Sequence, residues 1–170
     1  NDYKNIDVTG KTVVVLVNDP GFATQNDALF TGNAMTYYGR WTYKYEEAAR
    51  QGAKAVFIVH ETAPAAYPWG VVESSNTGTK YTLMDNNLNA SKLPVMGWLT
   101  LDATEKMFNA AKLNYQDLKQ AALKKHTLSM VLICHQLNLL CQQRLLHLSL
   151  LTKITLVKNL SSLLLIQIKA

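Results

Sequence analysis

Residues 41–59 read WTYKYEEAARQGAKAVFIV, a helical pattern that passes directly into a buried strand. From about residue 37 to residue 51 the apolar positions repeat at helical spacing, and one face carries Trp41, Tyr45, Ala48 and Ala49. Gly52 then stands where helices commonly end in a left-handed residue. Residues 53–59, which are apolar except for Lys54, indicate a buried strand. A helix followed by such a strand predicts an α/β fold.

Two further apolar runs predict the rest of the sheet. The run at 12–17, TVVVLV, is rich in β-branched residues and continuous rather than alternating, so we expect it to be covered on both faces. The run at 93–99, LPVMGWL, follows a long polar region. We expect principal strands at about 12–17, 54–59 and 94–99, and helices near 38–51, 102–112 and 115–125. Residues 22–36 and 62–92 are expected to be mostly irregular, with a short strand considered at 81–84. The expected core consists of Val14, Leu16, Ala48, Val56, Ile58, Val95 and Leu99.

Local spacings indicate how the predicted helices start and are stabilised. Asp102, with Glu105 three residues later, resembles a capping box, and Asn114 is expected to cap the last helix. Glu46 and Arg50 stand four residues apart, which favours an ion pair along the first helix.

The composition changes abruptly after residue 125. All twelve acidic residues, all eight glycines, all four prolines and every aromatic residue lie within residues 1–125, whereas the remainder holds fifteen leucines. A globular segment of that length needs Gly and Pro at its bends. We therefore expect residues 1–125 to form one domain and residues 126–170 to be an anomalous leucine-rich tail, produced by a frameshift in the gene or in its sequence record. The tail is expected to be non-native or an irregular helix.

The charge follows the same division. Residues 1–125 carry thirteen Lys and Arg against twelve Asp and Glu, so the net charge of +5 comes mainly from four bases in the tail. A nearly neutral domain without a basic stripe predicts no nucleic-acid partner. No apolar run reaches 18 residues, so we expect no membrane partner. The chain begins at Asn1, without a methionine, and is expected to be a fragment of a longer protein, so its localisation is unknown.

Three blocks of residues 1–125, in this order, resemble the protease-associated domain. They are residues 8–21, with Gly-Lys before an apolar strand; the pattern Lys44-x3-Ala48-x3-Gly52-Ala53-x-Ala55-Val56; and Leu93-Pro94-Val95 with the later Asp102-Ala103. More narrowly, residues 34–50, 59–62 and 67–69 resemble bacterial zinc aminopeptidases related to aminopeptidase Y and the glutamate carboxypeptidase group. The similarity covers about residues 5–125, and its most specific part is the Tyr/Trp-rich stretch that leads into the first helix.

The resemblance implies a small β-sandwich or sheet with flanking helices. It implies a non-catalytic module that covers or shapes the active-site entrance of a zinc-dependent aminopeptidase. The partner would be the peptidase domain of the parent protein or its peptide substrate, in an extracellular or periplasmic location. Two zinc ions are expected in that catalytic domain, but its ligand motifs do not follow here. For this chain the resemblance therefore implies no catalytic residue and no metal site.

Several polar residues invite a catalytic interpretation but lack the required spacing. His60-Glu61 would need a second histidine four residues after the first to form a helical zinc site, and that position is Pro64. We expect His60 to make a polar contact at a strand end. No nucleophile elbow surrounds Ser74 and Ser75, which are expected to make hydrogen bonds in a loop. In the tail, the spacing of Cys134, His135, Cys141 and His147 matches no standard zinc finger.

The aromatic residues are the best candidates for a binding role. A helix cannot bury residues 37, 38, 41, 43 and 45 along one stripe, so some of these rings must face elsewhere. Tyr, Trp and Arg side chains anchor interfaces because they combine large area with a polar group. Docking on the missing catalytic domain and simple core packing remain equally favoured, and contact with a ligand is a third option. The candidate interaction residues are Tyr37, Tyr38, Arg40, Trp41, Tyr43, Tyr67 and Trp69.

Two other classes of function compete with the protease-associated module. One is a free-standing domain that binds a peptide or a glycan through the 62–92 region and the aromatic residues. The other is a small α/β enzyme, which ranks last because the single histidine of residues 1–125 and scattered carboxylates do not assemble a nucleophile, a base and an orienting group.

Overall fold

The structure, a computed structural model, describes residues 3, 6–79, 81, 83–84, 86, 92–124 and 132–133. Its centre is one sheet in the order β3-β2-β1-β4, made of β1 (Thr12–Leu16), β2 (Ala55–Val59), β3 (Val95–Leu99) and β4 (Leu132–Ile133). β1, β2 and β3 are parallel, with Thr12 paired to Ala55 and Ala55 to Val95, whereas β4 is antiparallel to β1. The predicted mixed α/β class and its three principal strands are confirmed.

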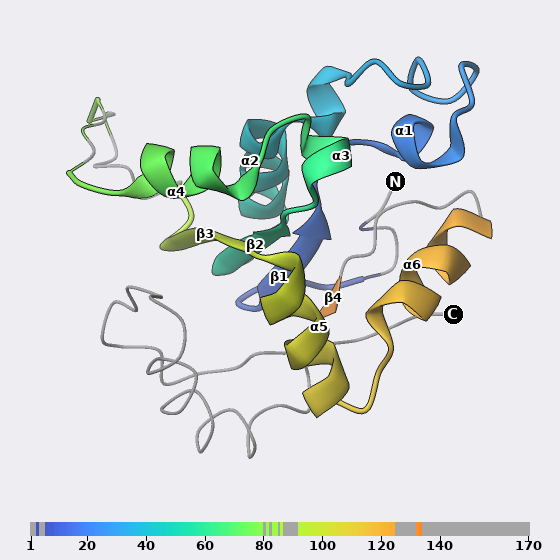
Figure 1. The fold of residues 1–170 in the computed structure, drawn as a ribbon. Helices are drawn as coiled ribbons and strands as arrows, with labels where there is room; N and C mark the ends of the chain where they lie inside the picture. Colours follow the sequence, from blue (N-terminus) through green and yellow to red (C-terminus); the bar gives the residue numbers. More distant parts are fainter. Residues whose placement is uncertain are drawn as a thin grey trace.

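Helices cover both faces of the sheet (Figure 1). The first half of the chain contributes α1 (Pro20–Thr24), the 3-10 helix η1 (Tyr37–Gly39) and α2 (Trp41–Arg50). The second half contributes α3 (Thr62–Ala65), α4 (Trp69–Asn76), α5 (Leu101–Ala110) and α6 (Tyr115–Lys124). The predicted helices near 38–51, 102–112 and 115–125 therefore exist, with slightly different bounds.

The alternation of side chains along β1 explains why its apolar run is continuous. Val13 and Val15 pack in one cluster with Ala48 of α2, whereas Val14 packs in a second cluster with Phe108 of α5. Each set of alternate residues thus has its own covering helices, so no position of the strand needs a polar residue. The prediction that both faces are covered is confirmed.

The predicted core is correct at the centre of the sheet and wrong near its margin. Val14, Ala48, Val56 and Ile58 are buried, but Leu16, Val95 and Leu99 are only half-buried. β3 has a described neighbour on one side alone, because its partner is β2, so its side chains are covered less completely. An apolar run indicates a strand but not its place in the sheet order.

Three local predictions need correction. The regions 62–92 and 22–36 contain helices that were not expected: α3 and α4 lie in the first region, and α1 extends into the second. The N-cap of α5 lies two residues earlier than expected: it is Thr100, not Asp102, and the Thr100 hydroxyl oxygen accepts a hydrogen bond from the Ala103 amide. The strand considered at 81–84 is not formed at residues 81, 83 and 84, and residue 82 lies outside the described residues.

Two other local predictions are confirmed. The Asn114 side chain accepts a hydrogen bond from the Asp117 amide, as a cap of α6 should. Gly52 is left-handed, with φ of 80°, and it closes α2 before β2 begins. An added Cβ at Gly52 would lie 3.3 Å from the Thr9 hydroxyl oxygen, so both backbone geometry and space favour glycine.

The described part of the leucine-rich tail is β4. Ile133 pairs with Val13 and Leu132 with Val14, on the edge of β1 opposite β2. The division of the chain at residue 125 and the frameshift remain predictions. The rest of the tail, with Cys134, His135, Cys141 and His147, lies outside the described residues.

Candidate functional site

Four of the aromatic side chains near the start of α2 pack edge to face, and three of them are well exposed. The ring of Tyr38 lies 5.0 Å from that of Tyr43 and 6.2 Å from that of Phe30, and Tyr37 lies 5.3 Å from Tyr43. Phe30 is 39% exposed, and Tyr37 and Tyr38 are each 53% exposed. Trp41, the first residue of α2, is 47% exposed and packs edge to face on Tyr45. We call the exposed side chains of Phe30, Tyr37, Tyr38, Arg40 and Trp41 the aromatic surface; the first three belong to the ring cluster around Tyr43, whereas Trp41 packs on Tyr45.

The end of β1 holds the segment that carries this surface. The Asn18 amide donates to the Gly39 carbonyl oxygen over 3.0 Å. The buried Asp19 carboxylate accepts hydrogen bonds from both the amide and the hydroxyl of Thr36, at 3.0 and 2.8 Å. A Cβ on Gly39 would come within 3.0 Å of the Asp19 amide nitrogen, so only glycine permits this approach. The aromatic surface is therefore fixed to the sheet.

The loop before η1 presents Phe30 from a strained backbone. Phe30, Thr31 and Gly32 are consecutive left-handed residues, with φ of 52°, 66° and 60°. This conformation is costly for a non-glycine residue and most unusual for a β-branched one such as Thr31. Strain of this kind, about 1–3 kcal/mol for each residue, gathers at binding sites and switches. Here the strained residue Phe30 is itself exposed, and its ring packs on that of Tyr38.

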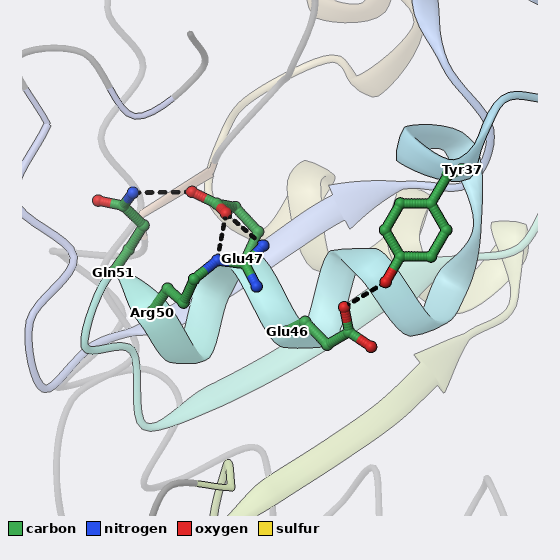
Figure 2. A network of polar contacts seen from close by, with 5 residues as sticks. All are labelled: Tyr37, Glu46, Glu47, Arg50 and Gln51. Carbon is green, nitrogen blue, oxygen red and sulfur yellow. Dashed lines mark hydrogen bonds and ion pairs between the residues drawn. The ribbon is translucent and has the colours of Figure 1, made fainter.

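A network of polar contacts runs along α2 beside the aromatic rings (Figure 2). The Tyr37 hydroxyl donates to Glu46 at 2.5 Å, and this hydrogen bond raises the pKa of the phenol. Glu47 accepts from Arg50 at 2.8 Å and from Gln51 at 2.8 Å. The predicted Glu46–Arg50 ion pair is therefore wrong: Glu46 accepts a hydrogen bond from Tyr37, and Arg50 pairs with Glu47 instead.

The remaining candidates, Tyr67 and Trp69, belong to a different cluster. Both rings pack around His60, with centroids 5.7 and 5.6 Å from the imidazole, and Trp98 lies 6.1 Å away. His60 is buried, and its Nε2 lies 3.0 Å from the Tyr67 carbonyl oxygen. The expected polar contact of His60 at a strand end is confirmed. The structure thus separates Tyr67 and Trp69, which are half-buried, from the cluster of Tyr37, Tyr38 and Tyr43. Trp41 joins neither group, because it packs on Tyr45.

Polar groups also gather where the parallel strands end, but they bond to one another or to the backbone. Glu61, after β2, accepts from the Tyr115 hydroxyl at 2.6 Å and pairs with Lys119 at 2.5 Å. Burial, and then the hydrogen bond to Glu61, raise the pKa of Tyr115. Asn18, after β1, donates to the Pro64 carbonyl oxygen. These contacts attach α3 and α6 to the sheet and explain the positions of the polar groups without any ligand.

The described residues contain no set of three or more His, Cys, Asp or Glu side chains placed to hold a metal ion. Ser74 donates to the Val71 carbonyl oxygen within α4, so it makes the expected local hydrogen bond, but from a helix rather than a loop. Within the part of the chain that is described, no helix has the length and apolarity needed to span a bilayer. Comparisons of the chain with family models, with curated proteins and with solved structures found no match.

Sequence reasoning missed two components of this region. Phe30 lies in a stretch treated as a polar loop, and nothing in its spacing signals a left-handed turn. The roles of Asn18 and Asp19 were missed because Asn-Asp-Pro-Gly is typical of a simple turn. The Asp-Pro pair could have indicated a helix start, since Asp is a common N-cap and Pro a common first residue. Asp19 does cap α1, accepting from the Gly21 amide.

Proposed function

We propose that about residues 5–125 form a non-catalytic module of the protease-associated type, which covers or shapes the active-site entrance of a zinc-dependent aminopeptidase. The observation that carries this proposal is the exposure of the aromatic surface. Packing of these rings in the core was an equally favoured alternative, and Tyr37, Tyr38 and Trp41 are about half exposed. Large aromatic side chains held rigidly at a surface are characteristic of protein interfaces.

The chemistry of the described residues fits a binding role better than a catalytic one. His60 is buried under aromatic rings, Glu61 is bonded to Tyr115 and Lys119, and Asp19 is engaged by backbone amides. Within the part of the chain that the structure describes, none of these groups is hydrogen-bonded to a serine or cysteine that it could activate as a nucleophile. The parent's two zinc ions would belong to the peptidase domain, and this module would contribute surface to it.

The β-sandwich architecture implied by the resemblance is part of the proposal. The four described strands belong to a single sheet, so a sandwich would need strands in addition to these. The proposal of a free-standing peptide- or glycan-binding domain rests on the same exposed rings, since aromatic faces also stack on ligands. The two proposals differ in whether a peptidase domain accompanies the module.

The encoding DNA distinguishes them. We expect one alternative reading frame beyond codon 125 to encode His, Asp and Glu motifs of a two-zinc aminopeptidase. A protein made with that frame restored should hydrolyse an aminoacyl-nitroanilide, and the double change Tyr38→Ala and Trp41→Ala should alter its selectivity between this small substrate and longer peptides. The matched control is Lys112→Gln, because Lys112 is an exposed residue beyond the end of α5. Stop codons in both alternative frames, or an unaltered selectivity, would contradict the proposal.

A further inference from the structure

We propose that the outer edge of β1, which faces away from β2, is an acceptor site for an extended apolar segment. The segment adds as an antiparallel strand and is recognised by its backbone rather than by its exact sequence. The occupant is the part of the same polypeptide that follows α6, and residues 132–133 fill the site in this chain. This inference goes beyond the proposed function, because it concerns the sheet of the module and needs no peptidase domain.

β1 has the composition and the burial of an interior strand. Val13 and Val14 are 0% and 2% exposed, and the strand contains no charged residue and no proline. The strand at the other margin of the sheet differs, because Met96 of β3 is 51% exposed and Pro94 directly precedes that strand. Proteins protect exposed sheet edges with charges, prolines or very short strands. The lack of such protection on β1 indicates that its outer edge is normally paired.

Alternate residues of β1 direct their backbone groups to opposite edges of the strand. The Lys11 carbonyl oxygen accepts from the Ala55 amide at the start of the ladder with β2, so Val13 also faces β2 and Val14 faces the outer edge. There Leu132 is the residue opposite Val14, in the short antiparallel ladder beside β1 (Figure 1). The Val14 amide therefore reports whether the outer edge is occupied, and the Val13 amide reports the ladder with β2.

The position of α6 explains why the segment after it reaches this edge and why that segment is antiparallel. Tyr115 and Lys119 of α6 bind Glu61 at the end of β2, and α6 also contacts α1, which follows β1. A segment that starts from this end of the sheet and runs beside β1 must be antiparallel to it. Residues 125–131 are the whole connection from α6 to β4, which is sufficient because an antiparallel strand needs no crossover helix.

The chemistry of the occupant follows from the two faces of β1. Val13 packs in the cluster that contains Ala48 of α2, and Val14 packs with Phe108 of α5 on the other face. A strand added beside β1 extends both of these apolar faces, so consecutive apolar residues suit it and charged residues do not. Main-chain hydrogen bonds supply the affinity of strand addition, whichever apolar residues carry them. The predicted frameshift agrees with this, since an out-of-frame segment would pair through features common to any apolar strand.

The first test compares the full chain with Leu132→Pro, which removes the amide opposite Val14. We expect hydrogen exchange of the Val14 amide to become at least about tenfold faster, whereas exchange of the Val13 amide stays within about twofold. Leu145→Pro makes the same change elsewhere in the tail and should alter neither amide. Amide exchange followed by NMR gives both rates on one sample.

The second test asks whether the vacated edge binds a strand. The probe is a labelled peptide with the sequence of residues 129–135 and the change Cys134→Ser. Its fluorescence polarisation should show binding to Leu132→Pro at least about tenfold tighter than to the full chain, whose own segment competes. A peptide with the same apolar residues in another order should bind within about threefold of the first, and should restore slow exchange at Val14. A peptide methylated at the backbone nitrogen of its leucine should not bind, because it lacks that donor.

If circular dichroism shows that Leu132→Pro does not fold, Ile133→Asp replaces it, because this change adds a charge and keeps every amide. Slow exchange at Val14 in the folded variant would overturn the inference. Peptide binding that is absent, insensitive to methylation, equal for the variant and the full chain, or restricted to one residue order would overturn it as well. Protection of Val14 that disappears when the full chain is diluted would show that a second copy supplies the strand, which also contradicts the proposal.

Discussion

The Tyr45 hydroxyl donates a hydrogen bond of 2.9 Å to the carbonyl oxygen of Gly97, which joins α2 directly to β3. Tyr45 is buried in the middle of α2, whereas Gly97 is the central residue of the strand at the margin of the sheet. The contact spans 52 residues of sequence and satisfies a backbone group of an edge strand, where unpaired groups favour aggregation. It therefore connects the helix that carries the aromatic surface to the least covered part of the sheet.

Replacing Tyr45 by phenylalanine should lower the free energy of unfolding by about 0.5–1.5 kcal/mol, because the Gly97 carbonyl oxygen loses its donor. Urea denaturation followed by circular dichroism measures the change. Tyr38→Phe is the matched control, since the exposed Tyr38 should shift the stability by less than about 0.5 kcal/mol. Equal effects of the two changes would show that the buried hydrogen bond makes no net contribution to the free energy of unfolding.

Ile58→Ala should destabilise the protein by about 2–5 kcal/mol, because Ile58 is fully buried in β2 beneath α2. Val95→Ala, in the half-buried β3, should cost clearly less and serves as the comparison. Midpoints of urea unfolding, analysed with a common slope, give both values. An unchanged midpoint for Ile58→Ala would contradict the assignment of the core.

Stability should fall as the pH rises above about 10, the ordinary pKa of tyrosine. Burial raises the folded-state pKa of both Tyr45 and Tyr115, so each phenol stays protonated in the folded protein while it ionises in the unfolded chain. The unfolded state then binds fewer protons, and the stabilisation present below pH 10 is lost by about 1.4 kcal/mol per pH unit for each phenol. Thermal unfolding between pH 8 and about 11.5 should show this slope.

The variant Tyr115→Phe provides the control for this alkaline effect. It removes one of the two phenols, so its stability should depend less steeply on pH above about 10 than that of the unmodified chain. Its stability at neutral pH should be lower, because Glu61 loses the hydrogen bond from Tyr115. A slope identical to that of the unmodified protein would show that Tyr115 does not ionise differently in the two states.

The chain by itself should bind no catalytic zinc and hydrolyse no peptide, because Pro64 stands where a second histidine would have to complete a helical zinc site with His60 and the carboxylate motifs of a two-zinc peptidase do not follow. Equilibrium dialysis followed by metal analysis measures the first property, and release of nitroaniline from aminoacyl-nitroanilides measures the second. Stoichiometric zinc with measurable turnover would overturn the prediction.

Cleavage near Lys124 or Lys125 should leave a soluble domain whose melting temperature is unchanged or higher. The reason is that an acid-free, leucine-rich tail favours aggregation rather than a defined contact. The structure sharpens this test, because Leu132 and Ile133 pair with β1. If the cut domain unfolds, β4 is an integral strand and the tail belongs to the native fold.

The elements of the sheet could be predicted because each is encoded locally. The β-branched run of β1, and the helix that Gly52 closes before β2, determine strands and crossovers within a few residues. The strand order could not be predicted in this way, so the half-burial of Val95 was missed. Which aromatic rings would be exposed could not be predicted either, because the position of Tyr38 depends on the close approach of Gly39 to Asp19, two residues far apart in the sequence. The Glu46–Arg50 pair was predicted wrongly because the spacing of residues along a helix gives no information on donors outside that helix, such as the Tyr37 hydroxyl that binds Glu46.

The order in which the strands occur along the chain has a consequence for protein synthesis. β1, β2 and β3 and the helices that cover them all precede residue 125, and neighbouring strands of this set are consecutive in sequence. Each strand can therefore join the sheet as it leaves the ribosome, at the usual rate of about 5–20 residues per second. A nascent chain whose reading frame changed after codon 125 would already hold a largely assembled domain. In the structure, residues 132–133 of the segment made after that codon add to the free side of β1, so the end of the chain would join a sheet that had already formed.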